Sequence, residues 1–349
     1  RLSQRRLRSS SCLEMRGIKA KVSLIVISQR DREMALALPD RWVWDSWFVW
    51  DGDDCHVFYL CASKGFNDPE ERHRAPSIGH AVSRDLVAWE ILPDALAPTQ
   101  GEGFDSWTTW TGSVVRADDG SWRMFYTGSS REDGGMIQRI GVATSDDLIR
   151  WEKLSAPVIE ADPQWYETLE QGDWPDQAWR DPWVFQKPGS TDWTMFITAR
   201  HRDGDPFRRG ALGVAHSDDL VSWTVEPPLS EPDHGFGQME VFQYAEVDGV
   251  PILLFCCGWR ELSPERVAQS GKVDATYSVV APSLEEFIDF NSARPVLDPL
   301  VYAGRLVQKP TGEWYLIGFT GYHNGVFVGE LSDPFRVTAT RESGLIVLT

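Results

Sequence analysis

The sequence predicts an all-β protein, a five-bladed β-propeller with four-stranded antiparallel blades around a central funnel. A strand ending in Ser-x-Asp-Leu and a Trp repeats without gaps at 77–90, 139–152 and 211–224, with weaker copies at 276–287 and 325–337. Two other kinds of strand recur upstream of each copy, and no segment keeps a 3.6-residue period, so helices should be few. Radially repeated four-stranded units form a propeller with one repeat per blade.

The first two strands of each repeat follow one order along the chain. The first strand ends in a polar turn, in the segments 45–54, 111–120, 181–190, 239–249 and 303–312. The second follows at once, in 55–63, 122–130, 193–201, 251–259 and 313–321. Turns such as Asp-Asp-Gly and Pro-Gly mark hairpins between them. The Ser-x-Asp-Leu strand comes third, and we expect its Trp to pack between blades.

Composition limits the function classes. The 349 residues are 42% hydrophobic with a net charge of −18, which argues against nucleic acid or an anionic membrane as partner. An acidic surface is also simply a soluble one, and we favour this interpretation of the charge. No apolar run approaches the roughly 18–20 residues that span a bilayer. Five cysteines without a CxxC motif predict neither a disulfide framework nor a zinc site, and they fit a cytoplasmic protein.

The N-terminal segment differs from the rest of the chain. Residues 1–33 carry nine Lys/Arg against three Asp/Glu, whereas Met34 opens MALALPDRWVWD, which resembles a natural start. We therefore predict a disordered extension or leader over 1–33 and a single propeller domain over 34–349. A secretory signal beginning at Met15 is the alternative, but its apolar run is short and no small-residue cleavage site follows it.

Acidic residues open three of the five innermost strands. They are Asp45 in WVWDSWFVW, Asp181 in WRDP and Glu240 in GQMEVF, and we place them at the equivalent register. Buried carboxylates repel one another and lose hydration, so packing alone would not bring three to one focus. A pair of carboxylates flanking a glycosidic bond is the machinery of glycoside hydrolysis, and a third can bind sugar hydroxyls. The pattern favours a glycosidase acting on a small carbohydrate.

Four motifs carry a resemblance to a known family over about residues 40–340. VWDSW at 43–47, WTGS at 110–113, RDP at 180–182 and YAG at 302–304 resemble motifs of the β-fructofuranosidase superfamily. This superfamily comprises glycoside hydrolase families 32 and 68, which include invertases, fructanases and levansucrases. The first motif is similar to the levansucrase form rather than the invertase form. The resemblance implies action on terminal β-D-fructofuranosyl groups of sucrose or fructooligosaccharides, by hydrolysis or transfer.

The resemblance also implies roles for individual residues. Asp45 would be the nucleophile, Asp181 the transition-state stabiliser and Glu240 the general acid/base of a retaining mechanism. Such a mechanism needs the nucleophile and the acid/base about 5–5.5 Å apart, and it needs no metal or cofactor. The substrate-binding residues would be Trp44, Trp110, Ser113, Arg180, Arg260 and Tyr302. We expect Arg180 and Asp181 to point to opposite faces of their strand, as neighbours on a strand do.

Some features depart from the family pattern and leave alternatives open. The context of Glu240 matches neither family, and about ten residues follow the last blade, which predicts a propeller-only form without a C-terminal β-sandwich. The segment 160–179 mixes acids with aromatics, as either a sugar-binding rim or a solvated loop does. The alternative functions are a family 43-like arabinofuranosidase or xylosidase and a propeller that binds sugar without cleaving it. The oligomeric state stays open.

Overall fold

The computed structural model describes residues 36–282, 284, 287–296 and 301–348. Residues 33–349 form one compact unit. The predicted extension over 1–33 lies outside the described residues. Among the described residues, no helix is both long and apolar enough to cross a membrane.

The first three blades are four-stranded sheets built from consecutive strands. Blade one contains β1 (Arg41–Asp51), β2 (Asp54–Ser63), β3 (Ser77–Ser83) and β4 (Glu90–Leu96). Blade two contains β5 (Thr108–Arg116), β6 (Trp122–Ser129), β7 (Gln138–Ser145) and β8 (Glu152–Lys153). Blade three contains β9 (Arg180–Gln186), β10 (Trp193–Arg200), β11 (Gly210–Ser217) and β12 (Thr224–Glu226).

The last two blades differ in size. Blade four contains β13 (Glu240–Val247), β14 (Val250–Cys257), β15 (Ala275–Val280) and β16 (Arg294–Pro295). Blade five is five-stranded, with β17 (Val301–Gln308), β18 (Trp314–His323), β19 (Val326–Leu331), β20 (Phe335–Thr340) and β21 (Gly344–Val347). Here the expected third strand is divided, because β20 pairs with the start of β18 and β19 pairs with its end. Pro334, which has no N–H to donate, lies between the two halves.

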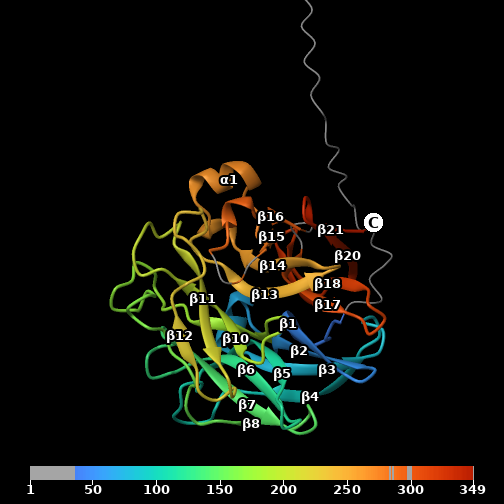
Figure 1. The fold of residues 1–349 in the computed structure, drawn as a ribbon. Helices are drawn as coiled ribbons and strands as arrows, with labels where there is room; N and C mark the ends of the chain where they lie inside the picture. Colours follow the sequence, from blue (N-terminus) through green and yellow to red (C-terminus); the bar gives the residue numbers. More distant parts are fainter. Residues whose placement is uncertain (1–35, 283, 285–286, 297–300, 349) are drawn as a thin grey trace, which may run out of the picture. The chain divides into compact units, whose positions relative to one another are not determined.

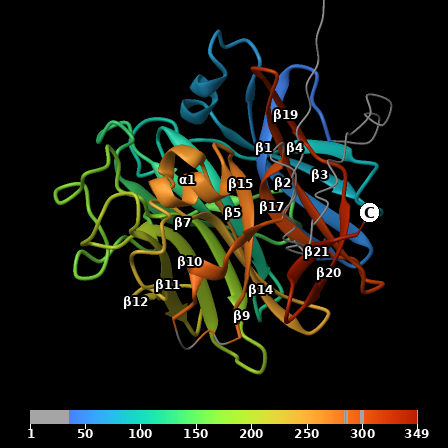
Figure 2. The same cartoon turned by 90° about the horizontal axis from the view of Figure 1, so that it is seen from above.

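The five sheets close into a ring. The first strand of each blade contacts that of the next, from β1 through β5, β9, β13 and β17 and back to β1. Neighbouring strands within a blade are antiparallel, as the pairing of β1 with β2 and of β2 with β3 illustrates. Figures 1 and 2 show the blades around a common centre in chain order. The predicted five-bladed β-propeller is confirmed, and the first strands line its axis.

The Ser-x-Asp-Leu turns are structural, as expected. In blade one the Ser83 hydroxyl accepts from the Leu86 N–H, and Leu86 adopts a left-handed φ of 69°. The Trp of the second copy, Trp151, packs edge-to-face on Phe58 of blade one at 5.6 Å. The Trp of the third copy, Trp223, packs in the same way on Phe125 of blade two at 5.4 Å. These two indoles therefore seal the joints between neighbouring blades.

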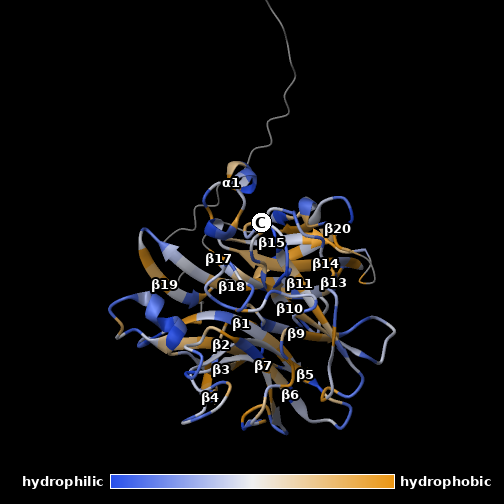
Figure 3. Cartoon of the chain, turned by 90° about the vertical axis from the view of Figure 1, so that its left-hand side faces the viewer, coloured by the Kyte–Doolittle hydropathy of each residue, from blue (hydrophilic) through white to orange (hydrophobic). Residues whose placement is uncertain are grey.

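Helical structure is sparse among the described residues. It consists of α1 (Pro264–Ser270) and three 3₁₀ turns, η1 (Pro69–Arg74), η2 (Trp259–Glu261) and η3 (Phe290–Ser292). Figure 3 shows hydrophobic residues concentrated on the strands and hydrophilic residues on the connections. Two of the turns, η1 and η2, follow the second strands of blades one and four. This position brings both to the mouth of the central funnel.

Candidate active site

A β-bulge interrupts the first strand of every blade near its start. The register shifts fall between Val43 and Ser46, Trp110 and Gly112, Arg180 and Trp183, Glu240 and Gln243, and Tyr302 and Arg305. A bulge adds one unpaired residue and re-aims the side chains around it. Here it turns successive side chains toward the axis, where regular alternation would send every second one away.

The bulges correct two expectations. The three acids are not at one register: Glu240 is the last paired residue before its bulge, whereas Asp45 and Asp181 lie inside theirs. The expectation that Arg180 and Asp181 face opposite ways is also wrong, because their charged groups lie 3.7 Å apart. In both cases the extra residue breaks the two-residue period on which the expectation rested.

Threonines of the preceding blade hold the bulged backbone in place. The N–H of Asp181 donates to Thr127 Oγ1 at 2.9 Å, and the N–H of Val241 donates to Thr198 Oγ1 at 3.2 Å. Asp181 and Val241 both have a φ of 57°, which is unfavourable for residues with a Cβ, and for β-branched Val above all. The threonine hydroxyls thus stabilise a strained backbone next to the acids.

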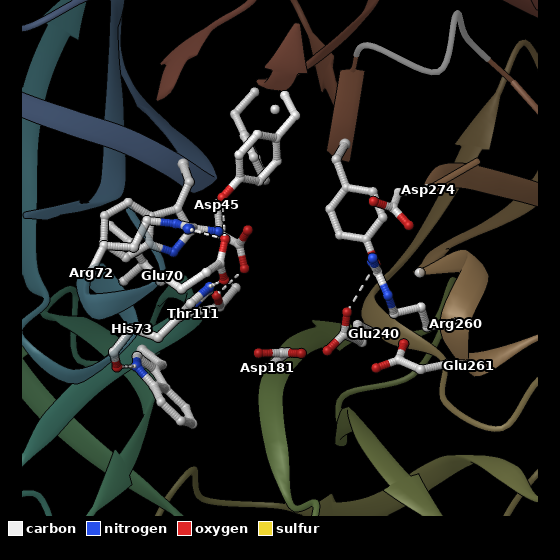
Figure 4. Close-up of a pocket in the computed structure, with 18 of the residues that line it drawn as sticks. Asp45, Glu70, Arg72, His73, Thr111, Asp181, Glu240, Arg260, Glu261 and Asp274 are labelled. Carbon is white, nitrogen blue, oxygen red and sulfur yellow. Dashed lines mark hydrogen bonds and ion pairs between the residues drawn. The ribbon is translucent and has the colours of Figure 1, made fainter. Parts of the chain in front are cut away.

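The acids line one cavity of about 720 Å³ at the mouth of the ring. Figure 4 shows the carboxylates of Asp45, Asp181 and Glu240 facing this space. The volume suits a small ligand such as a mono- or disaccharide. The sequence-predicted acids therefore converge, although from different register positions.

The Asp45 carboxylate accepts a hydrogen bond from blade two. Thr111 donates its hydroxyl hydrogen to Asp45 Oδ2 at 2.5 Å. Burial raises the pKa of Asp45 above its ordinary value, and the charge of Glu240 adds to this, while Thr111 and the charges of Arg305 and His73 act in the opposite direction. Asp45 and Glu240 lie across the cavity from each other (Figure 4).

Asp181 lies deepest. Its side chain is 5% exposed, and Oδ2 accepts from the Thr198 hydroxyl at 2.9 Å and from the Val241 N–H at 3.3 Å. Burial raises the pKa of Asp181 to about 7, with the charges of Glu240 and Asp45 adding to the rise and that of Arg180 opposing it. Such a group can both accept and donate hydrogen bonds near neutral pH.

Glu240 is held by two donors from neighbouring blades. Arg180 Nη2 donates to Oε1 at 2.6 Å, and the Tyr302 hydroxyl donates to Oε2 at 2.9 Å. Arg180 is oriented in turn by Gln138 Oε1 at 2.9 Å. Burial, with the charge of Glu240, raises the pKa of Tyr302 far above its ordinary value, so its phenol remains a donor. Both carboxylate oxygens are therefore fixed in direction.

A fourth acid, Glu261, stands beside Glu240 in the cavity (Figure 4). Burial raises the pKa of Glu261 to about 8, and the charge of Glu240 adds to the rise. Its turn is braced against the segment that precedes Glu240, because the Gly237 N–H donates to Glu261 O at 2.7 Å. Sequence reasoning did not single out Glu261, since it belongs to no recurring motif.

Five of the six predicted substrate-binding residues line the cavity, and one does not. Those that do are Trp44, Trp110, Arg180, Arg260 and Tyr302. Ser113 is absent from the described lining and is 1% exposed, and its Oγ accepts from the Val184 N–H of blade three at 3.0 Å. It couples two blades below the pocket. Thr111, two residues earlier on the same strand, lines the cavity instead.

The connection η1 supplies lining residues that the sequence analysis missed. Glu70, Arg72 and His73 all face the cavity beside Asp45 (Figure 4). The His73 carbonyl accepts from Trp110 Nε1 at 2.9 Å, which ties η1 to blade two. The charge-rich run PEERHR lies between the second and third strands of blade one, but the same connections of blades two and three also carry charged runs, SREDGGMI and HRDGDPFRR, so charge alone did not single out η1.

The segment 160–179 is anchored to blade three through one buried acid. Its Glu167 is 1% exposed and forms ion pairs with Arg200 at 2.8 Å and Arg209 at 3.2 Å. Of this segment only Asp176 lines the cavity. The buried ion pairs of Glu167 bind the segment to blade three, whereas Glu160, Glu170 and Asp173 are exposed to solvent.

The fold and site together define a five-bladed propeller whose funnel ends in a cluster of oriented carboxylates. The chain belongs to the glycosyl hydrolases family 32, whose N-terminal domain model matches residues 46–326. The match begins one residue after Asp45. It confirms the resemblance to the β-fructofuranosidase superfamily that the motifs indicated.

Curated relatives align over part of their length. The chain is 32% identical over 172 residues to Beta-fructofuranosidase 1 of Zea mays, covering 48% of this chain and 24% of the relative. It is 30% identical over 211 residues to a sucrose-6-phosphate hydrolase of Escherichia coli, covering 58% and 39% respectively. The chain thus spans well under half the length of these relatives.

Solved structures share the fold over most of the chain. An inulosucrase from Halalkalicoccus jeotgali, solved with kestose bound, has a TM-score of 0.73 at 23% identity and covers 91% of this chain and 93% of its own. A family 32 β-fructofuranosidase from Bombyx mori, one variant of which was solved with sucrose, has a TM-score of 0.68 at 21% identity, covering 88% and 63%. At these identities the likeness establishes the propeller fold.

Proposed function

We propose that this protein is a retaining glycoside hydrolase or transglycosylase acting on terminal β-D-fructofuranosyl groups. The observation that carries the proposal is the convergence of Asp45, Asp181 and Glu240 on one cavity, with separate donors orienting each acid. Membership of family 32 supports it over a family 43-like arabinofuranosidase or xylosidase. The oriented, mutually repelling carboxylates also favour catalysis over simple sugar binding.

In the proposed reaction Asp45 attacks the anomeric carbon while Glu240 protonates the departing oxygen. The fructosyl–Asp45 ester is then released when Glu240 removes a proton from water or from an acceptor hydroxyl. Asp181 bonds hydroxyls of the fructosyl ring and faces the positive charge that develops in the transition state. Arg180 and Tyr302 keep Glu240 aimed at the leaving oxygen throughout.

The leaving group would lie on the Glu240 side, where η2 forms the wall. Trp259 offers an aromatic ring there, with the Arg260 guanidinium 4.6 Å and the Lys272 ammonium 5.2 Å from its centroid. An indole face and hydrogen-bond donors suit a hexose. We propose that Arg260 contacts this unit.

The cavity carries charges of both signs. Its lining holds seven carboxyl groups, which are those of Asp45, Glu70, Asp176, Asp181, Glu240, Glu261 and Asp274, and four cationic side chains, Arg72, Arg180, Arg260 and Lys272. Burial raises the pKa of Asp181 to about 7 and that of Glu261 to about 8, so these two are partly or mostly protonated at neutral pH and the ionised acids outnumber the cations only slightly. Because the lining has no excess of positive charge, we propose sucrose and short fructooligosaccharides as substrates ahead of a phosphorylated disaccharide.

The test combines substrate choice with nucleophile rescue. Wild type, Asp45→Ala and the control Asp51→Ala, at the exposed end of the same strand, are incubated with sucrose, 1-kestose, sucrose 6-phosphate and an aryl α-L-arabinofuranoside. We expect wild type and the control to release fructose that is initially β, and Asp45→Ala to be inactive. Added azide should restore turnover in Asp45→Ala and give the α-fructosyl azide.

Three outcomes would overturn the proposal. An initially inverted product from wild type would remove the nucleophile role of Asp45. Consumption of the arabinoside without any fructoside would refute the substrate class. Binding of unaltered sucrose with no turnover of any substrate would favour the non-catalytic alternative.

A further inference from the structure

Two segments far apart in the sequence meet at the edge of the cavity. One is η1 of blade one, and the other is the hairpin formed by the end of β18 and the start of β19. The Tyr322 hydroxyl donates to Glu70 Oε1 at 2.6 Å, and the Arg72 guanidinium lies 4.0 Å from the ring centroid of Phe327. All four residues line the cavity, and we call them the rim wall.

This connection is a hydrogen-bonded β-hairpin rather than an irregular loop. Strand β18 continues beyond the residues that pair with β20, and its last residues pair with β19, Tyr322 opposite Phe327. The connecting Asn324 and Gly325 have φ values of 51° and 79°, the conformation of a two-residue turn that matches strand twist. The hairpin therefore holds Tyr322 at a fixed place above the cavity.

The contact with Glu70 is charge-assisted. Glu70 also pairs with Arg72 at 2.9 Å and with His73 at 3.4 Å. The His73 contact, with those of Tyr322 and Arg72, holds the pKa of Glu70 well below its usual range, so it accepts as a carboxylate. A hydrogen bond to an ionised acceptor is shorter and stronger than a neutral one. Tyr322 is 48% exposed, and its ring also packs on that of Phe327 at 5.3 Å.

The rim wall stands on the nucleophile's side of the site. Figure 4 shows Glu70 and Arg72 near Asp45, with Glu240 across the cavity. Trp44, the neighbour of Asp45, packs edge-to-face on His73 of η1 at 6.1 Å. In a double displacement the leaving group departs on the side of the acid/base, away from the nucleophile. The rim wall thus bounds the fructosyl group on the side opposite to the leaving group.

We propose that the rim wall, fastened by the bond between Tyr322 and Glu70, blocks any sugar unit beyond the bound fructosyl group and so confines cleavage to chain ends. The inference rests on the proposed function and adds the residues that would set its specificity. An internal unit of a fructan carries a further unit on one of its own hydroxyl oxygens, and we place that further unit against Tyr322 and Glu70. Sucrose and terminal units carry none.

The test compares internal with terminal cleavage. Tyr322→Phe removes only the hydrogen bond, Tyr322→Ala also removes the ring, and Val326→Ala is a matched control, because Val326 is 67% exposed on the same hairpin and outside the cavity lining. Each variant and wild type is given sucrose and a long β-2,1-linked fructan with blocked chain ends, and the melting temperature is recorded. Products are separated by chain length.

We expect the wild type and Val326→Ala to release fructose from sucrose and nothing from the blocked fructan. Loss of a charge-assisted bond should raise the population of conformations in which residue 322 has moved away from Glu70 roughly 10- to 150-fold. Tyr322→Phe should therefore release short oligosaccharides, and Tyr322→Ala more of them. Turnover of sucrose is recorded for each variant, and cleavage of the blocked fructan relative to that of sucrose should rise in Tyr322→Phe and further in Tyr322→Ala.

The failures are distinguishable. If wild type does not cleave sucrose, the proposed function itself fails. If wild type cleaves sucrose but both Tyr322 variants leave the blocked fructan intact, the rim wall does not enforce terminal cleavage. A parallel loss of sucrose turnover and thermal stability in the variants, with no internal cleavage, would assign Tyr322 a purely structural role and overturn the inference.

Discussion

The hydrogen bond from Thr111 to Asp45 sets the pH at which the proposed nucleophile becomes ionised. Thr111→Val removes the donated hydrogen at 2.5 Å and leaves the side-chain volume nearly unchanged. A carboxyl group is nucleophilic only when ionised, and burial already raises the pKa of Asp45. Without the donor, the ionised form loses stabilisation, so the pKa must rise further.

The size of this effect follows from the bond. A hydrogen bond to a charged group contributes about 1.5–3 kcal/mol, and 1.36 kcal/mol corresponds to one pKa unit. The acid limb of kcat/KM should therefore move up by about 1–2 pH units. Because Asp45 is open to the cavity, where water can replace part of the lost bond, we expect a shift near the lower end.

The assay is the pH profile of kcat/KM with sucrose between about pH 4 and 8, with the melting temperature measured alongside. Thr109→Val is the matched control: Thr109 is on the same strand and buried, and its hydroxyl has no partner among the described residues. This variant should keep the profile of the wild type. An acid limb that stays in place in Thr111→Val, or moves equally in the control, would refute the assignment.

Three further predictions concern other contacts. Tyr302→Phe removes a donor to Glu240 and should lower kcat/KM for sucrose roughly 10- to 150-fold. The melting temperature should fall by no more than a few degrees, and an unchanged kcat/KM would contradict the role of Tyr302. Ser113→Ala leaves the buried Val184 N–H without its acceptor, so urea unfolding should show a loss of about 1–3 kcal/mol with KM unchanged, and a raised KM would return Ser113 to the sugar site. Glu261 has its pKa raised by burial from 4.5 to about 8, so the folded state binds the extra proton in this interval and loses stability as the pH rises through it. Glu261→Gln lacks this component, and its stability relative to wild type should increase from pH 4.5 to 8; parallel stability curves would contradict it.

The blade architecture could be predicted because its signals are local. In each Ser-x-Asp-Leu turn the serine and aspartate side chains bind backbone N–H groups only two or three residues away, as Asp85 does with Val87 and Ala88. The same residue types therefore recur in the sequence wherever such a turn occurs. Five copies then fix the number of blades, and the starts of the first strands identify the funnel acids.

The bulges could not be predicted, and they decide which side chains face the funnel. They leave no common residue type: the left-handed positions are occupied by Asp181, Val241 and Ala303 rather than by glycine. Their support comes from another blade, through hydroxyls such as those of Thr127 and Thr198. A contact between blades has no local signature in a single sequence, which is why Ser113 was placed at the sugar and Thr111 was not.

Two buried cations offset the repulsion among the three clustered carboxylates. Arg180 bonds Glu240 and lies 3.7 Å from Asp181, whereas Arg305, in the YAGR segment, is 1% exposed and donates to the carbonyls of Ser46 and Val241 in two other blades. Burial lowers the pKa of Arg305 to about 10, so it stays charged at neutral pH, and its charge favours ionised Asp45. Since the bonds of Arg305 are to backbone carbonyls, its charge is not neutralised by a single carboxylate and acts on both Asp45 and Asp181. The arginine that ties blade five to blade one therefore also offsets part of the repulsion among the three carboxylates.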